Sequence, residues 1–305
     1  MNVPFIPFNE GEALLDWIGL TDALAAGHDM PKAEIADTFL YRDPDTLLSR
    51  AAWINGLGMA VKTATIFPDN PSRDKPMVNG GVNLYSDDDG ALEAIIGFHL
   101  VTKWKTAGDS LLGARLLARQ DSENILIVGA GNQGRALHSA YYAVFPNAKF
   151  TVWNRTKANA EKMATEIPGI TVADDLETAV CGADIITSAT MSTDPLIKGS
   201  WLQPGQHVDL IGAYRPDMRE VDDEALVRAR VFVDSFETTI GHIGEINIPL
   251  EAGTIEREHL IADFYDPDNF KRTSPEDITL FKNGGGAHLD LMTSRFILDR
   301  WKASV

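Results

Sequence analysis

The chain has 305 residues, which is more than one compact domain usually needs, so its length predicts about two domains. Apolar residues make up 44% and charged residues 23%, a composition that is ordinary for a globular protein. The 44 acidic residues outnumber the 27 basic residues and give a net charge of −17, which argues against binding to nucleic acid or to an anionic membrane, because both attract cationic surfaces.

The first third of the chain predicts a mixture of helices and strands. Apolar residues at helical spacing predict a helix over Glu10–Ala26. Apolar and β-branched residues fill both faces of Met59–Phe67, which predicts a buried strand. Two further strands are predicted over Val78–Tyr85 and Ala91–His99, on either side of an aspartate-rich turn.

From about residue 113 the pattern changes to strands that alternate with helices. A helix over Asp109–Arg119 leads into the strand Asn124–Val128. Later strands are predicted over Phe150–Trp153, Asp184–Thr187, His207–Ile211 and Val231–Asp234. This spacing is typical of a parallel sheet with helices on both faces. We therefore predict an α/β fold in which a doubly wound Rossmann domain over residues 113–288 follows an α+β domain over residues 1–112. The final helix, Leu289–Trp301, can return to that first domain, so residues 289–305 would complete it.

The segment Ile125–Leu137 reads ILIVGAGNQGRAL and contains the pattern G-x-G-x-x-G between a predicted strand and a predicted helix. Gly129 permits a tight turn, Gly131 lets the backbone approach a pyrophosphate, and Gly134 allows the helix to pack closely on the strand. The start of the helix offers free N–H groups to the phosphates. A glycine-rich turn without a nucleotide is the alternative, but motif and context together predict a dinucleotide site. Ala130, Asn132 and Gln133 complete the predicted loop.

The end of the next predicted strand indicates which dinucleotide binds. An NAD site usually has an acidic residue about 20 residues after the glycine loop, where it holds the ribose 2′-hydroxyl. Here Asn154, Arg155 and Thr156 follow the strand, and these groups can hold a 2′-phosphate that a carboxylate would repel. We therefore predict that NADP(H) is preferred and that NAD(H) can also bind, because Arg155 can instead be a solvated charge or stack on adenine. Thr190, Met191 and Ser192 follow a later strand and are predicted to line the same cleft.

Several motifs, in order along the chain, resemble the ornithine cyclodeaminase/mu-crystallin family. The likeness extends from about Arg50 to the C-terminal helix. Leu100–Ser110 resembles the helix start that precedes the glycine fingerprint, and Trp153–Thr156 resembles the NADPH-binding members. The remaining matches are Val61–Lys62 with Phe67–Pro71, Gly212–Glu220, and the C-terminal motif of Leu280–Lys282, Gly285 and Asp290.

The resemblance implies a homodimer in which an antiparallel sheet of the first, substrate-binding domain pairs across the subunits. It implies two classes of chemistry. Cyclodeaminases use bound NAD as a redox catalyst and release ammonia, whereas reductases pass hydride from NAD(P)H to the C=N bond of a cyclic ketimine or an imino acid. The resemblance also implies that Thr106, Gly212 and Gly285 lie beside the cofactor.

Three cations are predicted to hold a substrate carboxylate. Lys62 lies in an otherwise apolar strand, where an unpaired lysine is costly, and it resembles the family lysine that meets the carboxylate. Arg50 resembles a family arginine with the same role. Lys105 stands where the family usually has arginine, so a point charge replaces a planar, two-pronged contact. Surface charges, or alkyl stems that extend along apolar surface, are the alternatives for all three.

Two residues depart from the cyclodeaminase pattern. Tyr214 stands where cyclodeaminases have an aspartate that handles the substrate amine, so deamination would lack its base. Reduction of a protonated imine depends instead on its position over the nicotinamide. Asp109 either stabilises the start of a helix or holds an iminium or amino group. His288 is either a proton donor or a histidine in a loop.

These observations predict an NADPH-dependent reductase of a small imino acid or cyclic ketimine, such as Δ1-pyrroline-2-carboxylate. Lys62 and Asp109 would be catalytic, and Tyr214 would contact the substrate. Three alternatives stay open: an ornithine-type cyclodeaminase, an alanine-type amino-acid dehydrogenase, and a crystallin-like protein that binds NADPH without turnover.

The remaining expectations concern metals and the cellular compartment. A single cysteine, Cys181, excludes an internal disulfide and a cysteine cage, and the histidines lack metal-site spacing, so we predict no metal. The sequence contains no apolar run of about 18 residues, so we predict no membrane span. The N-terminus has no basic region followed by an apolar core, which favours the cytoplasm over secretion.

Overall fold

The computed structural model describes residues 3–304, which divide into two compact units. The first unit comprises Met1–Lys105 and Gly286–Val305, and the second comprises Thr106–Gly285. The sequence predicted boundaries after residues 112 and 288, so both boundaries differ by a few residues. The first of them falls inside one continuous helix, Phe98–Leu117, and a helix that belongs to both units shows no change of composition at the boundary.

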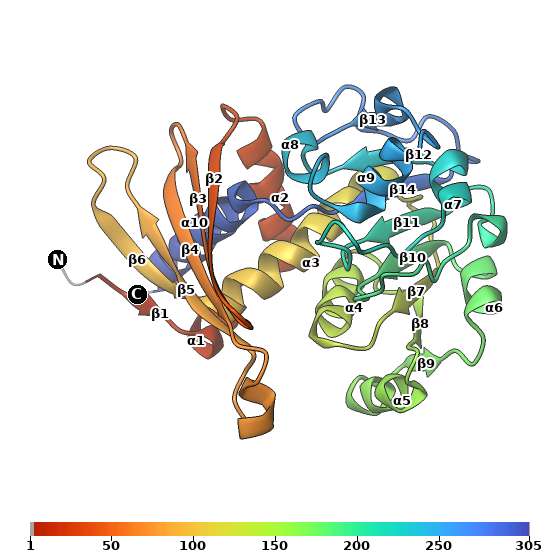
Figure 1. The fold of residues 1–305 in the computed structure, drawn as a ribbon, viewed down its shortest axis with the longest axis horizontal. Coiled ribbons are helices and arrows are strands. Elements are labelled where there is room, and N and C mark those ends of the chain that lie inside the picture. Colours follow the sequence, from red (N-terminus) through yellow and green to blue (C-terminus); the bar gives the residue numbers. More distant parts are fainter. Residues whose placement is uncertain (1–2, 305) are drawn as a thin grey trace. The chain divides into compact units, whose positions relative to one another are not determined.

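The first unit contains a six-stranded sheet with helices packed against it. Its strands follow the order β1-β6-β5-β4-β3-β2, and each neighbouring pair is antiparallel except β1 and β6. The strands are β1 (Phe5–Ile6), β2 (Glu34–Arg42), β3 (Asp45–Ile54), β4 (Gly58–Ile66), β5 (Val78–Tyr85) and β6 (Leu92–Gly97). The helices are α1 (Phe8–Glu12), α2 (Trp17–His28), the first residues of α3 (Phe98–Leu117), and α10 (Ala287–Ser304). Helix α10 packs on β3, β4 and α2 (Figure 1).

Several elements of this unit match the sequence predictions. The predicted strands Met59–Phe67 and Val78–Tyr85 are confirmed as β4 and β5, and the predicted helix Leu289–Trp301 lies within α10. The prediction of one helix over Glu10–Ala26 is wrong. The chain leaves the helical conformation after α1, and the Asp16 side chain then begins α2 by accepting a hydrogen bond of 2.6 Å from the backbone N–H of Gly19.

Helix α3 begins earlier than the sequence predicted. We expected a strand over Ala91–His99 and a helix only from Asp109, but β6 ends at Gly97 and α3 starts at the next residue. Phe98 and Leu100 alternate as in a strand, whereas Leu100 and Trp104 are also spaced as on one helix face, and all three are buried. The apolar pattern therefore fits both periods, and tertiary packing selects the helix.

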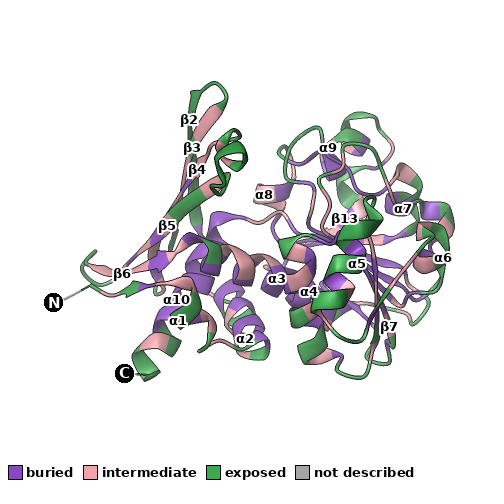
Figure 2. Ribbon diagram, turned by 90° about the horizontal axis from the view of Figure 1, so that it is seen from below, coloured by how far each residue is buried: buried purple, intermediate pink, exposed green. Residues whose placement is uncertain are grey.

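The hairpin of β2 and β3 was not predicted. Strand β2 forms one edge of the sheet and is almost entirely exposed (Figure 2). Three successive large side chains, Phe39, Leu40 and Tyr41, expose 46%, 60% and 76% of their surface. A strand with both faces exposed shows no alternation of apolar and polar residues, so its sequence carries no period-2 signal.

The second unit contains an eight-stranded, entirely parallel sheet in the order β13-β12-β14-β11-β10-β7-β8-β9. Its strands are β7 (Asn124–Val128), β8 (Lys149–Trp153), β9 (Ile170–Val172), β10 (Ile185–Ser188), β11 (His207–Leu210), β12 (Arg230–Val233), β13 (Leu260–Ala262) and β14 (Thr279–Lys282). Besides α3, its helices are α4 (Asn132–Val144), α5 (Lys157–Glu166), α6 (Leu176–Cys181), α7 (Asp223–Arg228), α8 (Phe236–Thr239) and α9 (Gly244–Glu251).

This sheet confirms the predicted α/β fold with a Rossmann domain. Strand β7 has the predicted bounds, and β8, β10, β11 and β12 differ from the prediction by one residue at one or both ends. Strands β9 and β13 have three residues each, which is too short for a periodic signal, and the sequence did not predict them or β14.

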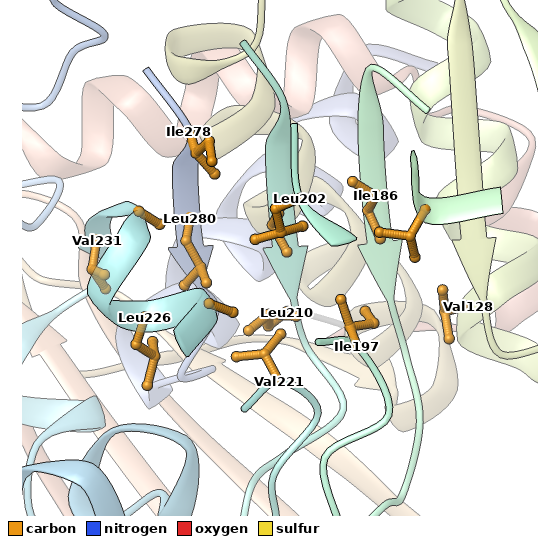
Figure 3. Close-up of a cluster of buried hydrophobic side chains, with 14 of the residues drawn as sticks. Val128, Ile186, Ile197, Leu202, Leu210, Val221, Leu226, Val231, Ile278 and Leu280 are labelled. Carbon is orange, nitrogen blue, oxygen red and sulfur yellow. The ribbon is translucent and has the colours of Figure 1, made fainter. Parts of the chain in front are cut away.

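One face of the parallel sheet carries a large apolar cluster. Figure 3 shows Val128, Ile186, Leu210 and Leu280 from four neighbouring strands, together with the side chains that cover them. All four are at most 1% exposed, and full burial of such a side chain contributes about 1.5–3 kcal/mol. The cluster holds the strands in register, so their carboxyl ends form one edge. At that edge β7 lies between β8 and β10, where the strand order reverses, and ligands of such sheets bind at this point.

Candidate functional site

The glycine loop follows β7 directly and has the geometry that the motif predicts. Gly129 has a φ of +112°, and a Cβ there would lie 2.7 Å from the carbonyl oxygen of Ala189. A Cβ at Gly134 would lie 2.0 Å from the carbonyl oxygen of Gly129, so α4 packs closely on the turn. Around Gly131, in contrast, no described atom outside its chain neighbours comes within 4 Å of that position. Backbone atoms of the chain therefore fill the space beside Gly129 and Gly134. The space beside Gly131, which is expected to meet a pyrophosphate, is open.

The loop after β8 is tied to the glycine loop by Asn154. Its Oδ1 accepts a hydrogen bond of 3.1 Å from the backbone N–H of Ala130, and its Nδ2 donates one of 2.9 Å to the carbonyl of Thr156. Asn154 therefore has a structural role here, which its sequence position did not indicate. Arg155 and Thr156 are exposed beside it, where they can contact a ligand.

Three more of the predicted cofactor residues lie in loops at the carboxyl ends of β10, β11 and β14. A Cβ at Gly212, after β11, would lie 1.9 Å from the carbonyl oxygen of Thr190, after β10, so these two loops touch. Gly285, after β14, has a φ of +73° and donates a hydrogen bond of 2.7 Å to Oδ2 of Asp234. Of the other predicted residues, Met191 is 66% exposed, and Ser192 donates a hydrogen bond of 2.6 Å to the carbonyl of Asp194.

Thr106, the last predicted cofactor residue, lies on α3. Its carbonyl accepts a hydrogen bond of 3.0 Å from Nδ2 of Asn283, whose Nδ2 is also 3.2 Å from Oγ of Ser110. Asn283 directly precedes the loop that carries Gly285. The structure thus shows how Thr106 is tied to that loop, whereas its contact with a cofactor stays a prediction.

In the first unit, Lys62 is buried and paired. Its Nζ lies 2.8 Å from Oδ1 of Asp290 and 4.7 Å from the ring centroid of Phe98. Burial lowers the pKa of Lys62 to about 8, although the charge of Asp290 opposes that shift. Burial alone would raise the pKa of Asp290, but Lys62 and the neighbouring cations hold it below its ordinary value. The sequence required a partner for this lysine but did not identify it, because Asp290 is 228 residues away.

Arg50 and Lys105 lie near Lys62 and form one cluster with it, whereas their contact with a substrate carboxylate stays a prediction. Arg50 lies opposite Lys62 in the β3–β4 register, and its guanidinium pairs with Asp37 at 2.7 Å. Lys105 is 6% exposed, and it acts with Arg50 to lower the pKa of Lys62. Three cations and two carboxylates, those of Asp37 and Asp290, carry one net positive charge. Such a cluster can accept one more carboxylate.

His288 is not a loop histidine. It is the second residue of α10 and is fully buried, with its ring centroid 5.4 Å from that of His28. Burial, together with the nearby His28 and Lys105, holds the pKa of His288 well below its ordinary value. Whether His288 donates a proton in the reaction stays a prediction.

Asp109 and Tyr214 differ in their surroundings. Asp109 is fully buried in the middle of α3, so the expectation that it stabilises the start of a helix is wrong. Tyr214 follows β11 and is 57% exposed, with the guanidinium of Arg215 at 5.8 Å from its ring centroid. Tyr214 is therefore accessible to a ligand, and its contact with the substrate stays a prediction.

The described residues also bear on metal sites and membrane spans. Within residues 3–304, no group of three or more His, Cys, Asp or Glu side chains is arranged to hold a metal ion. In the same range, each helix is too short or too polar to cross a membrane. The absence of a metal from the reaction stays a prediction.

The parallel sheet with its glycine loop defines a protein of the Rossmann dinucleotide-binding class, and a mostly antiparallel sheet belongs to a separate unit. Residues 53–305 match the ornithine cyclodeaminase/mu-crystallin family. The chain belongs to this family, which confirms the resemblance seen in its motifs.

Relatives within this family are similar over most of the chain. The Delta(1)-pyrroline-2-carboxylate reductase of Paracoccus denitrificans (strain Pd 1222) is 47% identical over 301 residues, which cover 96% of this chain and 95% of that protein. The ketimine reductase mu-crystallin of Mus musculus is 31% identical over 246 residues, which cover 80% of this chain and 77% of that protein. The solved structure of Thermococcus litoralis Delta(1)-pyrroline-2-carboxylate reductase in complex with NADH and L-proline has a TM-score of 0.90 at 25% identity, covering 99% of this chain and 98% of that one.

Proposed function

We propose that this protein is an NAD(P)H-dependent imine reductase that converts Δ1-pyrroline-2-carboxylate to proline. The observation that carries the proposal is the cluster of the buried Lys62 and Lys105 with the partly buried Arg50, whose net positive charge suits a small carboxylate. The 47% identity to a Delta(1)-pyrroline-2-carboxylate reductase supports this substrate. The glycine loop after β7 supports the use of a dinucleotide.

The predicted site residues would bind and orient the substrate. Arg50 and Lys105 would neutralise the carboxylate, and Lys62 would approach it with an ammonium group that Asp290 holds in place. Because the pKa of Lys62 is about 8, its Nζ keeps its proton at neutral pH, yet gives it up more readily than an exposed lysine. Asp109 would stabilise the positive charge of the protonated imine. Bound NAD(P)H supplies the hydride.

A spectrophotometric assay tests this function. Purified protein mixed with NADPH and Δ1-pyrroline-2-carboxylate should oxidise the nicotinamide and form proline. Lys62→Met should abolish most of this rate, whereas Lys103→Met, which removes a half-exposed lysine paired with Glu12, should retain it. Ammonia release from ornithine would instead identify a cyclodeaminase. NADPH oxidation only with pyruvate and ammonia would identify an alanine-type dehydrogenase, and binding of NADPH without turnover would identify a crystallin-like protein.

NADPH is proposed as the preferred cofactor. Arg155 and Thr156 are exposed at the end of β8, and the amide of Asn154 occupies the place where an NAD site usually has a carboxylate. Arg155→Ala should raise the KM for NADPH by about tenfold and leave the KM for NADH almost unchanged. Lys157→Ala is the matched control, because Lys157 already pairs with Asp174 at 2.5 Å. Equal KM values for the two cofactors in the wild type would refute the preference.

A homodimer is proposed through the exposed edge of the first unit. Leu40 and Tyr41 of β2 line a hollow of about 330 Å³ together with Leu47 and Phe67, and an exposed apolar edge strand invites pairing with another chain. Leu40→Glu should halve the mass measured by light scattering. Val227→Glu, a change at an equally apolar and 52% exposed position on α7, should leave the mass unchanged.

A further inference from the structure

A buried carboxylate, that of Glu220, fastens the loops that follow β10 and β11. Its Oε1 accepts hydrogen bonds from Oγ of Ser188 at 2.6 Å and from the backbone N–H and Oγ1 of Thr190, both at 2.8 Å. Its Oε2 accepts from the backbone N–H groups of Gly212 at 2.6 Å and Ala213 at 3.3 Å. The Glu220 carboxylate thus accepts hydrogen bonds from five donors in the segments that end β10 and β11, and its side chain is fully buried.

The two loops that Glu220 joins are closely packed against each other. A Cβ at Gly212 would lie 1.9 Å from the carbonyl oxygen of Thr190 and 2.6 Å from Oε1 of Glu220. On its other side, the loop after β10 meets the glycine loop, where a Cβ at Gly129 would lie 2.7 Å from the carbonyl oxygen of Ala189. The position of the loop after β10 is therefore set by the glycine loop on one side and by Glu220 with Gly212 on the other.

Glu220 is itself held from several directions. Its backbone N–H donates to Oε2 of Glu245 at 2.6 Å, and Oε1 of Glu245 accepts from the N–H of Val221 at 3.2 Å. Its carbonyl accepts from the N–H groups of Leu196 and Ile197 at 2.9 and 3.0 Å. Val221, the next residue, is anchored in the apolar cluster of Figure 3. Because the backbone cannot shift freely, the carboxylate acts as a fixed point for the loops.

A buried cation lies near this carboxylate. The ammonium of Lys282, at the end of β14, donates hydrogen bonds of 2.8 Å to the carbonyls of Leu210 and Asn283. Burial lowers the pKa of Lys282, and the charges of Glu220 and Glu245 oppose that shift. The positive charge of Lys282 and the negative charge of Glu220 therefore attract each other.

We propose that Glu220 is a positioning residue for the nicotinamide half of the cofactor. In a Rossmann sheet the dinucleotide lies across the carboxyl ends of the strands at the switch point, here between β7 and β10. The loop after β8, with Arg155, is on the adenosine side, so the loops after β10 and β11 are on the nicotinamide side. The inference rests on the proposed use of NAD(P)H, but it assigns a role to a residue that does not itself contact the ligand.

The chemistry of the site predicts which substitution is informative. Glu220 accepts on both oxygens and donates nothing. In Glu220→Gln the amide has nearly the same shape, but its NH₂ group must face either the donors of Ser188 and Thr190 or those of Gly212 and Ala213. Either the three donors of Ser188 and Thr190 or the two of Gly212 and Ala213 then lose their acceptor, and a donor left without a partner in a buried site is costly.

The test compares two ligands that differ only in the nicotinamide half. Isothermal titration measures the Kd of NADPH and of the fragment adenosine 2′,5′-bisphosphate, which lacks the whole nicotinamide half, without substrate. In Glu220→Gln the Kd of NADPH should rise about tenfold, whereas the Kd of the fragment should change by less than about twofold. Equal weakening of both ligands, or no weakening of NADPH, would overturn the proposal. Failure of the proposed reaction would show instead as a wild type that binds NADPH but does not reduce the imine.

A matched control separates positioning from stability. Asp222→Asn makes the same carboxylate-to-amide change two residues away, where the side chain accepts from the backbone N–H groups of Gly199 and Ala225. It should lower Tm and leave the ratio of the two Kd values unchanged. If Glu220→Gln does not fold, Ser188→Ala removes one of the five donors and should raise the Kd of NADPH about twofold with no effect on the fragment. An unchanged ratio in Ser188→Ala would then refute the proposal.

Discussion

The two units bury charge for opposite purposes. The first unit gathers cations, and Lys62 has a pKa lowered to about 8 because it is buried. The second unit gathers carboxylates, and burial raises the pKa of Glu245 to about 7 and that of Asp209 to about 6. In the first unit the surplus charge is positive and suits an anionic ligand. In the second unit the carboxylates are used by the chain itself, since Glu220 and Glu245 accept hydrogen bonds from backbone N–H groups. Buried charge alone therefore does not identify a ligand site, and the partners of each group decide its role.

The largest expected effect is on the buried pair of the first unit. Lys62→Met leaves the carboxylate of Asp290 buried without its ammonium, which should cost about 3–5 kcal/mol in the free energy of unfolding. The double variant Lys62→Met with Asp290→Leu should recover most of that stability and none of the substrate binding. Urea denaturation measures the first quantity and titration with L-proline the second. Additive losses in the double variant would show that the two residues do not act as a pair.

The next prediction contrasts space filled by the chain with space left open. Gly134→Ala places a methyl group against the carbonyl of Gly129 and should lower the free energy of unfolding by about 1–3 kcal/mol or more. Gly131→Ala meets open space at an ordinary φ of −82° and should change stability by less than about 0.5 kcal/mol. It should nevertheless weaken NADPH binding. Calorimetry of both variants tests this, and equal destabilisation would contradict the assignment of the two glycines.

A smaller effect concerns the pH dependence of stability in the second unit. The pKa of Glu245 is raised to about 7 in the folded state, so the folded protein holds its proton more tightly than the unfolded chain. This contribution is present below the unfolded pKa and is lost as pH rises through about 7. The free energy of unfolding of Glu245→Gln, measured relative to that of the wild type, should therefore rise by about 1–2 kcal/mol as the pH is raised from 5 to 8. Because both proteins contain the same histidines, the histidine titrations cancel in the difference between the two free energies of unfolding. A difference that stays constant with pH would contradict the raised pKa of Glu245.

The smallest predicted effect is on ligand binding in the first unit. Because the pKa of Lys62 is about 8, its ammonium loses its proton as pH rises above that value. The Kd of pyrrole-2-carboxylate, whose own charge is constant in this range, should rise about threefold between pH 7 and pH 9. Lys62→Arg keeps its charge and should show a flat profile. A rise in both proteins would assign the effect to another group.

Local patterns predicted the core of the second unit well. Strand β7, the glycine loop and the start of α4 are neighbours in sequence, so their spacing is readable from the chain. The predictions were weaker where two periods fit the same residues, as at Phe98–Trp104, and where an edge strand is exposed on both faces, as in β2. Asp109 was assigned to the start of a helix for the same reason, since the true start lies at Phe98.

The sequence by itself determined the class of this protein: a parallel sheet, a glycine loop for a dinucleotide, and cations suited to a carboxylate. These features depend on the type and spacing of nearby residues, which set backbone conformation and local charge. Only the tertiary structure decided the partners. Lys62 pairs with Asp290, which is 228 residues away in the sequence. Glu220 joins two loops that lie about 30 and 8 residues before it in the sequence. Such pairs depend on which elements pack together, and no local pattern encodes that choice.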